Sequence, residues 1–290
     1  MTVTRRRFLS IAASFAATPA LAQGHTWSGR AFGADVSIVL NGPADVTTRA
    51  VQKAQTLMKE VEGMFSLYDP TSDLAVLNMT GEHTVPAQFE TLMQIADVAH
   101  TLTDGLFDPT IQPLWRALAD GNDVTAAQAS VGWDRVDRRG NHVRLGPGQA
   151  LTFNGIAQGF ATDLVADTLR ALGFTRTLVN IGEYRGAGGP WRLGVADPQH
   201  GLLATRTITD MAVATSSPMA TPLGQQGHIV HATQAPHWST VTVEAETAAM
   251  ADALSTGLVL ADRALVDRVR GAKGVHRITI VDPVGNLTTL

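Results

Sequence analysis

Cysteine is absent from the 290-residue sequence. Its absence excludes disulfide bonds, thiolate metal ligands and cysteine nucleophiles. Three common site signatures are also missing: the G-x-S-x-G turn, the G-x-x-x-x-G-K-[ST] phosphate loop and the G-x-G-x-x-G dinucleotide motif. Their absence argues against α/β-type serine hydrolases, P-loop kinases and ordinary dehydrogenases.

Basic residues are fewer than acidic ones. The sequence has 22 Lys and Arg against 26 Asp and Glu, which gives a formal net charge of −4. Removal of the N-terminal segment described next, with its three arginines, changes this charge from −4 to −7. An acidic surface repels phosphate backbones, so we expect no nucleic-acid partner.

The first 22 residues have the features of an export signal. Thr4 to Ser10 reads TRRRFLS, an apolar stretch follows, and Ala20-Leu21-Ala22 is a small-x-small cleavage site. The paired arginines resemble a Tat signal. The alternatives are an ordinary signal peptide or a short membrane anchor, although a bilayer span needs about 20 apolar residues. We predict Tat export to the periplasm, cleavage after Ala22 and one mature domain over 23–290.

Hydrophobic periodicity predicts a mixed series of helices and strands. Helices are expected over 47–64, 87–102, 156–173, 246–260 and 262–270, and strands over 34–40, 151–153, 177–182, 191–196, 205–209, 211–215, 228–231, 239–244 and 276–281. Turn-rich or loop segments lie at 65–78, 103–113 and 186–190. Strands and helices do not alternate strictly, so the sequence predicts the α+β class.

The stretch FNGIAQGFATD, from Phe153 to Asp163, places small residues at the start of a predicted helix. Gly155, Ala157 and Gly159 leave little side chain to keep a ligand away from the backbone. The free N–H groups of a helix start also suit phosphate groups. Tight packing of this helix on a sheet selects the same small residues, so both interpretations stay open.

The loop TDGLFDPTIQPL, from Thr103 to Leu114, contains two acids. Asp104 precedes a glycine and Asp108 precedes a proline, and both pairs are typical of turns whose carboxylate bonds nearby backbone. Two acids in one rigid loop are equally able to accept hydrogen bonds from a ribose or an amino group of a ligand.

The predicted helix ETAAMADALSTGL, from Glu246 to Leu258, carries two polar groups on an apolar background. Asp252 and Thr256 are four residues apart and therefore share a face. A carboxylate and a hydroxyl one turn apart form part of a ligand shell for Mg²⁺, which prefers oxygen donors. The alternative is that Asp252 caps a neighbouring element.

Three histidines lie close together in GHIVHATQAPH: His228, His231 and His237. A zinc site on His228 and His231 is disfavoured, because on a strand this spacing puts them on opposite faces and no acid completes the set. One histidine beside a substrate is the preferred interpretation.

Eight segments in this order resemble the ApbE family of FAD:protein FMN transferases: AFGADVSI, FSLYDPTSDLAVLN, TDGLFDPTIQPL, NGIAQGFATD, LVNIGE, ATSSP, HIV and ADALSTGL. The resemblance covers about residues 30–260, nearly all of the predicted mature chain. It implies an ApbE-like (T-fold-like) two-lobed α+β fold with mixed sheets and packed helices. It also implies Mg²⁺-dependent transfer of FMN from FAD to a Thr or Ser of an acceptor protein, with release of AMP.

The resemblance further assigns roles to individual residues. The metal ligands would be the backbone carbonyl of Ala157 with Asp252 and Thr256. The FAD contacts would come from Tyr68 over the isoalloxazine ring, from Asp104, and from the loop with Gly155, Ala157 and Gly159, with Asp163 near the flavin. The base that accepts the proton of the acceptor hydroxyl is open between Asp163, Asp252 and His228.

The chain departs from the family pattern at several positions. Thr152, Asn154 and Gln158 stand where the family's loop has an acid, a glycine and a lysine, and Glu183-Tyr184 replaces Gly-Asp. Ser217 replaces a glycine. With the twin-arginine signal, these changes resemble the NosX branch, which serves nitrous oxide respiration by flavinylating the membrane protein NosR.

Three other functions remain open from the sequence. One is a Mg²⁺-dependent FAD pyrophosphatase, which would use the same site with water as the nucleophile. The second is a non-catalytic periplasmic flavin-binding assembly protein, which the loss of the lysine at Gln158 favours. The third is a zinc protein using His228 and His231.

Overall fold

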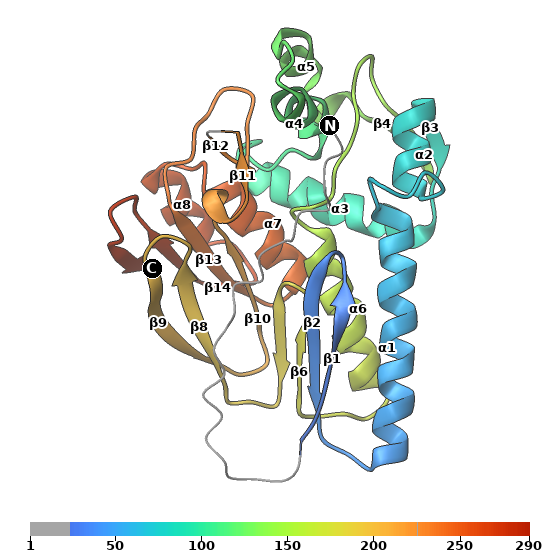
Figure 1. The fold of residues 1–290 in the computed structure, drawn as a ribbon, viewed down its shortest axis with the longest axis vertical. Helices are drawn as coiled ribbons and strands as arrows, with labels where there is room; N and C mark the ends of the chain where they lie inside the picture. Colours follow the sequence, from blue (N-terminus) through green and yellow to red (C-terminus); the bar gives the residue numbers. More distant parts are fainter. Residues whose placement is uncertain (1–23, 225) are drawn as a thin grey trace.

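The computed structural model describes residues 24–224 and 226–290, so the predicted export signal and its cleavage site after Ala22 lie outside the described residues. Figure 1 shows a large sheet with helices packed against it and a group of shorter elements above. Within the described ranges, every helix is too short or too polar to traverse a lipid bilayer.

The main sheet has eight strands, and every neighbouring pair in it is antiparallel. In spatial order the strands are β1 (His25–Ala31), β2 (Ala34–Leu40), β6 (Thr177–Asn180), β7 (Tyr184–Ala187), β10 (Ala212–Ser216), β13 (Thr240–Ala245), β14 (Val275–Val281) and β15 (Leu287–Thr289). In β2, Ala34, Val36, Ile38 and Leu40 are buried, whereas Asp35 is exposed and the other alternate residues are half-buried, as the two-residue period of a strand requires. The antiparallel sheet with separate helices confirms the α+β class.

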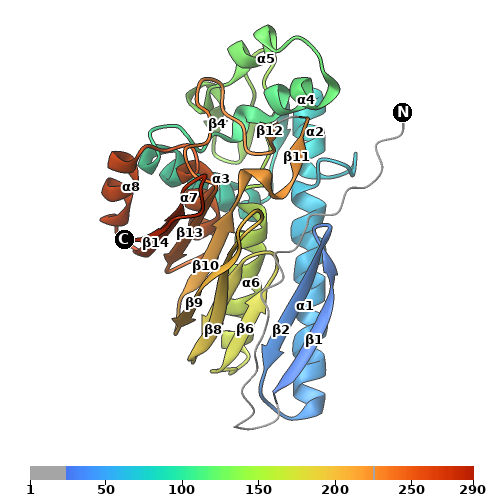
Figure 2. The same ribbon diagram turned by 60° about the vertical axis from the view of Figure 1, so that its left-hand side comes forward.

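Helices cover one face of this sheet (Figure 2). They are α1 (Ala44–Phe65), α6 (Ala157–Ala171) and α7 (Ala248–Leu258), with α3 (Ala87–Leu102) packed on α7 and α8 (Arg263–Arg270) beside β14. The central helix α6 packs on both α1 and α7, and both α6 and α7 pack on strands of the sheet. The start of α6 is therefore held at the junction of three elements.

A hairpin of β8 (Trp191–Asp197) and β9 (Gly201–Ile208) lies over the opposite face of the sheet (Figure 2). Leu193 and Ile208 of the hairpin form a small core with Leu178 and Val213 of the sheet. Neighbouring side chains of a strand point to opposite faces, so the next residue, Val179, belongs to the core under the helices.

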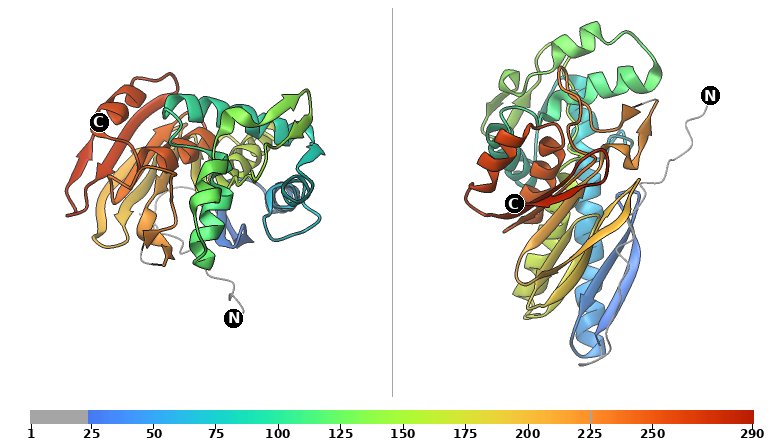
Figure 3. Two further views of the ribbon diagram at one scale, coloured as in Figure 1. Left: turned by 90° about the horizontal axis from the view of Figure 1, so that it is seen from above. Right: turned by 90° about the vertical axis from the view of Figure 1, so that its left-hand side faces the viewer.

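Shorter elements form a second lobe beyond one end of the sheet (Figure 3, right). They are α2 (Asp73–Thr80), α4 (Gln112–Asp120), α5 (Thr125–Ser130) and a three-stranded sheet in the order β3 (Glu82–Thr84), β5 (His142–Arg144), β4 (Asp137–Arg139). A 3-10 turn, η1 (Pro109–Ile111), connects this lobe to the loop after α3.

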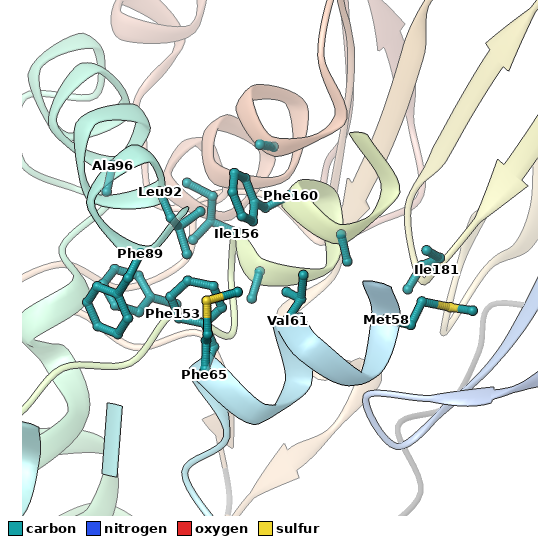
Figure 4. Packing of buried hydrophobic residues seen from close by; sticks show 14 of the residues in the cluster. Met58, Val61, Phe65, Phe89, Leu92, Ala96, Phe153, Ile156, Phe160 and Ile181 are labelled. Carbon is teal, nitrogen blue, oxygen red and sulfur yellow. The ribbon is translucent and has the colours of Figure 1, made fainter. Parts of the chain in front are cut away.

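Four phenylalanines join the two lobes in the main core (Figure 4). The ring centroid of Phe65, at the end of α1, lies 4.9 Å from that of Phe89, 5.4 Å from that of Phe153 and 6.2 Å from that of Phe160. These separations are in the range of favourable aromatic pairs. The segment that leads into α6 is thus anchored by Phe153 on one side and Phe160 on the other.

The predictions of strands at 151–153 and 228–231 are wrong. The Leu151 N–H donates to the Asn78 side chain and the Thr152 N–H to the Pro109 carbonyl, while the His228 N–H donates to the Pro218 carbonyl. These backbone groups bond loops and side chains, so no ladder forms. An apolar run indicates burial, but a strand also needs a partner strand alongside.

Several boundaries also differ from the predictions. Helix α2 begins inside the segment expected as turns, because the Ser72 hydroxyl accepts a hydrogen bond from the Ala75 N–H and caps it. Helix α4 begins at Gln112, within the expected loop, and β7 continues into the expected turn at 186–190. The predicted positions of the remaining main helices and of most long strands are confirmed to within a few residues.

Candidate active site

A cavity of about 290 Å³ opens where the second lobe meets the sheet and the helices. Its walls come from the β6–β7 turn, strand β10, helix α7, the segment before α6, the loop around η1 and residues 217–221 and 228–230. The candidate site residues Tyr68, Asp108, Gly155, His228, Asp252 and Thr256 line it, all of them named from the sequence. Residues more than 180 positions apart in the chain are brought together here.

Among the described residues that line the cavity there is no lysine or arginine. Four acids line it, namely Asp35, Asp108, Glu183 and Asp252, and His228 is the single histidine of this set. The described lining therefore supplies no permanent positive charge. A phosphate-bearing ligand in this cavity needs a cation from elsewhere.

Two of these acids are buried close to each other. Asp252 projects from α7, and its Oδ2 accepts a hydrogen bond from the Gly159 N–H at 3.1 Å. Burial raises the pKa of Asp252 to about 7. Burial first, and then the charge of Asp252, raise the pKa of Glu183 well above its ordinary value. A carboxyl pair of this kind is stabilised in its charged form by a cation between the two groups.

A chain of hydroxyls fixes the direction of the proton on Thr256. The Ser255 hydroxyl donates to the Asp252 carbonyl at 3.0 Å, so its oxygen accepts from Ser216 at 2.8 Å. Because Ser216 has one proton, its oxygen must accept from the Thr256 hydroxyl at 3.2 Å. The remaining lone pairs of Thr256 are then available to a metal ion.

These donors fit a hard divalent cation such as Mg²⁺. The residues that could hold it are Asp252 and Thr256, one helical turn apart on α7, and their oxygens are of the type that Mg²⁺ prefers. Within 24–224 and 226–290 there is no cluster of three or more His, Asp or Glu side chains suited to a metal. A magnesium site completed by hydroxyl, carbonyl and water ligands needs no such cluster.

The tautomer of His228 is set by its surroundings. Its Nδ1 lies 2.9 Å from the Pro218 carbonyl oxygen, which can only accept, so Nδ1 carries the proton and Nε2 the lone pair. Burial lowers the pKa of His228 below its ordinary value of 6.5. The Trp115 Nε1–H donates to the His228 carbonyl at 3.1 Å and holds the residue in place. The ring is therefore neutral near pH 7 and able to accept a proton.

The zinc interpretation finds no support in this geometry. His231 does not line the cavity, and its Nδ1 accepts hydrogen bonds from the N–H groups of Thr233 and Gln234. His228 and His231 do not lie on a strand. The expectation that they point to opposite faces of a strand is therefore wrong in its premise.

The structure does not bring Asp163 to the cavity. Its two carboxylate oxygens accept from the N–H groups of Ala248 and Ala249 at 2.9 Å each, at the start of α7, and Oδ1 also accepts from Arg185 at 2.8 Å. Burial raises the pKa of Asp163, although Arg185 and these backbone bonds oppose the shift. Asp163 holds α7 in position and is not among the residues that line the cavity, so the structure gives no geometric support for its contact with the flavin.

Gly159 also serves packing. A Cβ at this position would lie 2.3 Å from the Ala248 carbonyl oxygen, so only glycine lets α6 approach the start of α7 this closely. Gly155 differs, because it lines the cavity, and a Cβ there would meet the Thr256 side chain at 2.9 Å. Within the stretch Phe153 to Asp163, the packing interpretation thus applies to Gly159 and the ligand-approach interpretation to Gly155.

Asp104 and Ala157 are not among the residues that line the cavity. The Asp104 carboxylate is exposed and pairs with Arg268 of α8, so the structure gives no geometric support for its contact with FAD. Asp108, four residues later, does line the cavity and caps η1 by accepting from the Thr110 N–H. Ala157 is the first residue of α6, and its backbone carbonyl remains a predicted ligand.

Several residues of the cavity had no role predicted from the sequence. Glu183 and Ser216 are the main ones, since one supplies a buried carboxyl and the other orients Thr256. A signal was present for Glu183, because an acid stands two residues after Ile181, the last residue of an apolar run, where the family pattern has glycine. Ser216 gave no signal, because its role depends on helix α7.

Substitution of Gly159 should separate its packing role from any role in chemistry. We expect Gly159→Ala to lower the free energy of unfolding by about 3 kcal/mol or more, because the methyl group overlaps backbone that cannot move alone. Gly63→Ala is the matched control: this position in α1 has open space, and alanine should stabilise it by roughly 0.5 kcal/mol. Urea unfolding measures the free energy of unfolding of both variants. Equal changes in the two variants would contradict the packing role of Gly159.

The buried carboxyl pair should also make the metal-free protein sensitive to pH. Asp252 has a folded-state pKa of about 7 against an ordinary value of 3.8, so the folded state holds an extra proton between these values. Stability should therefore fall as the pH rises through this window, by up to a few kcal/mol. Urea unfolding in EDTA from pH 5 to 8 measures this loss. Asp252→Asn should remove most of this loss of stability. If the variant's free energy of unfolding falls with pH as steeply as that of the unaltered protein, Asp252 is not the cause of the loss.

Comparison with solved structures identifies this fold as that of flavin transferases. The chain superposes on the flavin transferase ApbE from Vibrio cholerae with a TM-score of 0.82, at 23% identity, over 93% of this chain and 97% of that one. Residues 32–274 match the sequence profile of the ApbE family, and the chain belongs to that family.

Two curated relatives are consistent with membership of this family. The FAD:protein FMN transferase of Haemophilus influenzae is 26% identical over 80% of this chain and 78% of its own length. The enzyme of the same name from Vibrio cholerae is 28% identical over 70% of this chain and 71% of its own. The family expected from the eight segments is thereby confirmed.

Proposed function

We propose that this protein is a Mg²⁺-dependent FAD:protein FMN transferase. It moves FMN from FAD to a Thr or Ser of an acceptor protein and releases AMP. The observation that carries the proposal is the cavity of an ApbE-family chain in which Asp252, Thr256 and His228 meet without a cationic side chain. FAD carries a pyrophosphate, and the absence of lysine and arginine from the described lining explains why a metal ion is required.

Asp252 and Thr256 would hold the Mg²⁺, with the Ala157 carbonyl as a further ligand. When bound, the ion neutralises charge on the pyrophosphate during phosphoryl transfer. Tyr68 lines the cavity with 83% of its surface exposed, so its ring is free to cover a flavin. The backbone at Gly155 allows a ligand to approach the start of α6.

His228 is the residue best placed to accept the proton. The hydroxyl oxygen of the acceptor forms a bond to the phosphorus on the FMN side, and the bond from that phosphorus to the bridging oxygen breaks. AMP leaves with the bridging oxygen, and the hydroxyl proton passes to Nε2 of His228. Asp163 is fully engaged at α7 and Asp252 is assigned to the metal, so His228 is the remaining candidate.

The cellular setting is a further part of the proposal. The twin-arginine segment at residues 4–10 supports Tat export to the periplasm and cleavage after Ala22. The acceptor would then be a membrane-bound or periplasmic electron-transfer protein. The departures at Gln158, Glu183 and Ser217 support the NosX branch, and NosR is the acceptor this suggests.

The experiment mixes the protein from Gln23 onward with FAD, Mg²⁺ and the flavin-accepting domain of NosR, and reads the intact mass of the acceptor. A gain of one FMN that requires Mg²⁺ supports the transferase. AMP and free FMN without a mass gain would replace it with an FAD pyrophosphatase. Tight FAD binding with no turnover on this or other flavin-accepting domains would replace it with a carrier.

A further inference from the structure

Glu183 is a buried acid to which the mechanism above assigns no role. It stands in the turn between β6 and β7, and the Asn180–Tyr184 pair of the ladder closes that turn. Its carbonyl accepts hydrogen bonds from the Ile181 N–H at 3.1 Å and from the Thr162 hydroxyl at 3.3 Å. The backbone is held on both sides, and the side chain lines the cavity.

Its carboxylate has one protein partner. Oε2 accepts from the Thr215 N–H at 3.2 Å, and within the described part of the chain no lysine, arginine or histidine forms a salt bridge with Glu183. A buried acid without a cationic partner is unfavourable when ionised. The second oxygen, Oε1, is left to a ligand or to a proton.

Glu183 and the metal ligands of α7 share their neighbours. Thr215, which bonds the Glu183 carboxylate, is followed by Ser216, whose hydroxyl contacts Thr256 at 3.2 Å. On the other side, α6 bonds Asp252 through the Gly159 N–H and Glu183 through Thr162, one helical turn later. The Thr162 bond goes to the backbone carbonyl of Glu183, so α6 holds the residue that carries one carboxyl group and bonds the other directly. Both acids line the same cavity, one from the β6–β7 turn and one from α7.

We propose that Glu183 is a second carboxylate ligand of the divalent cation held by Asp252 and Thr256. The inference rests on the proposed function, since it concerns the metal of that site. Two carboxylates balance the charge of a divalent cation, and hard oxygen donors on two elements select Mg²⁺ or Mn²⁺. The cation would also serve as the missing partner of Glu183.

Metal binding tests the proposal without measuring transfer. Free Mn²⁺ is titrated by its EPR signal against the protein from Gln23 onward, without FAD. We expect Glu183→Gln to weaken binding by about 10- to 100-fold and Asp252→Asn to weaken it at least as much. Asp35→Asn is the control, because this acid lines the cavity but has a side chain that is 77% exposed. It should bind Mn²⁺ as the unaltered protein does.

Thermal unfolding with and without Mn²⁺ separates a ligand from a merely structural residue. Glu183→Gln should unfold in EDTA at the same or a higher temperature than the unaltered protein, because a neutral amide replaces a buried acid without a cationic partner, and it should lose most of the stabilisation by Mn²⁺. A structural role predicts a lower unfolding temperature in both conditions. Glu183→Asp keeps the charge and should retain part of the Mn²⁺ affinity.

The outcomes distinguish this inference from the function on which it rests. If Asp252→Asn loses Mn²⁺ and Glu183→Gln binds it normally, Glu183 is not a ligand, and the metal-dependent function still stands. If the unaltered protein binds neither Mn²⁺ nor Mg²⁺, both the inference and the metal dependence of the proposed function are overturned.

Discussion

Asp252→Ala should abolish transfer of FMN to the acceptor protein. We expect the rate to fall by on the order of 10³-fold or more, because the variant loses a charged metal ligand and the described cavity lining holds no lysine or arginine to replace the cation. Intact-mass measurement of the acceptor at saturating FAD and Mg²⁺ gives the rate. The variant should fold, since removal of an unfavourable buried acid offsets the loss of the acceptor for the Gly159 N–H.

Asp104→Asn is the matched control for this experiment. Both residues were implicated by the family resemblance, but Asp104 is exposed and paired with Arg268 of α8 outside the cavity lining. We expect the control to transfer FMN at nearly the normal rate and with a normal requirement for FAD. A large loss in Asp104→Asn would show that this acid does hold FAD. Retained transfer in Asp252→Ala would remove this residue from the metal site.

His228→Gln should lower the rate of transfer by about 10²- to 10⁴-fold, the range for loss of a general base. Burial lowers the pKa of His228 below its ordinary value of 6.5, so in the unaltered protein the ring is still mainly neutral at pH 6.5. Activity that depends on the neutral ring should therefore persist as the pH falls to 6.5 and decline only below it. The His228→Gln variant should not show this decline, because glutamine does not titrate.

The measurement is the rate of acceptor flavinylation from pH 5 to 8 at saturating Mg²⁺. Saturation matters because Asp252 also titrates in the metal-free protein, and excess Mg²⁺ keeps it ionised. His231→Gln is the control, since this histidine does not line the cavity. An unchanged rate in His228→Gln would assign proton transfer to another group and leave this histidine a structural role.

Much of the fold could be predicted from the sequence. The positions of α1 and α3 follow from helical spacing, because one face of each is buried. The positions of α6 and α7 were also predicted, although α7 and the first half of α6 are buried on most sides. The failures occur where the outcome depends on distant partners. The segment 151–153 is apolar and buried but bonds Asn78 and Pro109 rather than a strand.

The same distinction holds for the site. The spacing of Asp252 and Thr256 on one helical face is a local property, and the structure brings both to the cavity. The sequence could not tell Asp104 from Asp108, because both are acids in one loop. Contacts with α8 in one case and with the cavity in the other decide between them.

By itself, then, the sequence determined the family, the α+β class and the local groupings that carry the chemistry, since these depend on order, period and spacing. Only the tertiary structure decided which acids face the cavity. Asp163 is engaged by backbone groups 85 and 86 residues away, and Glu183 is oriented by Thr215, 32 residues away. The burial of a carboxyl group and its hydrogen-bond partners, which set its chemistry, arise from contacts between segments that the chain order does not place together.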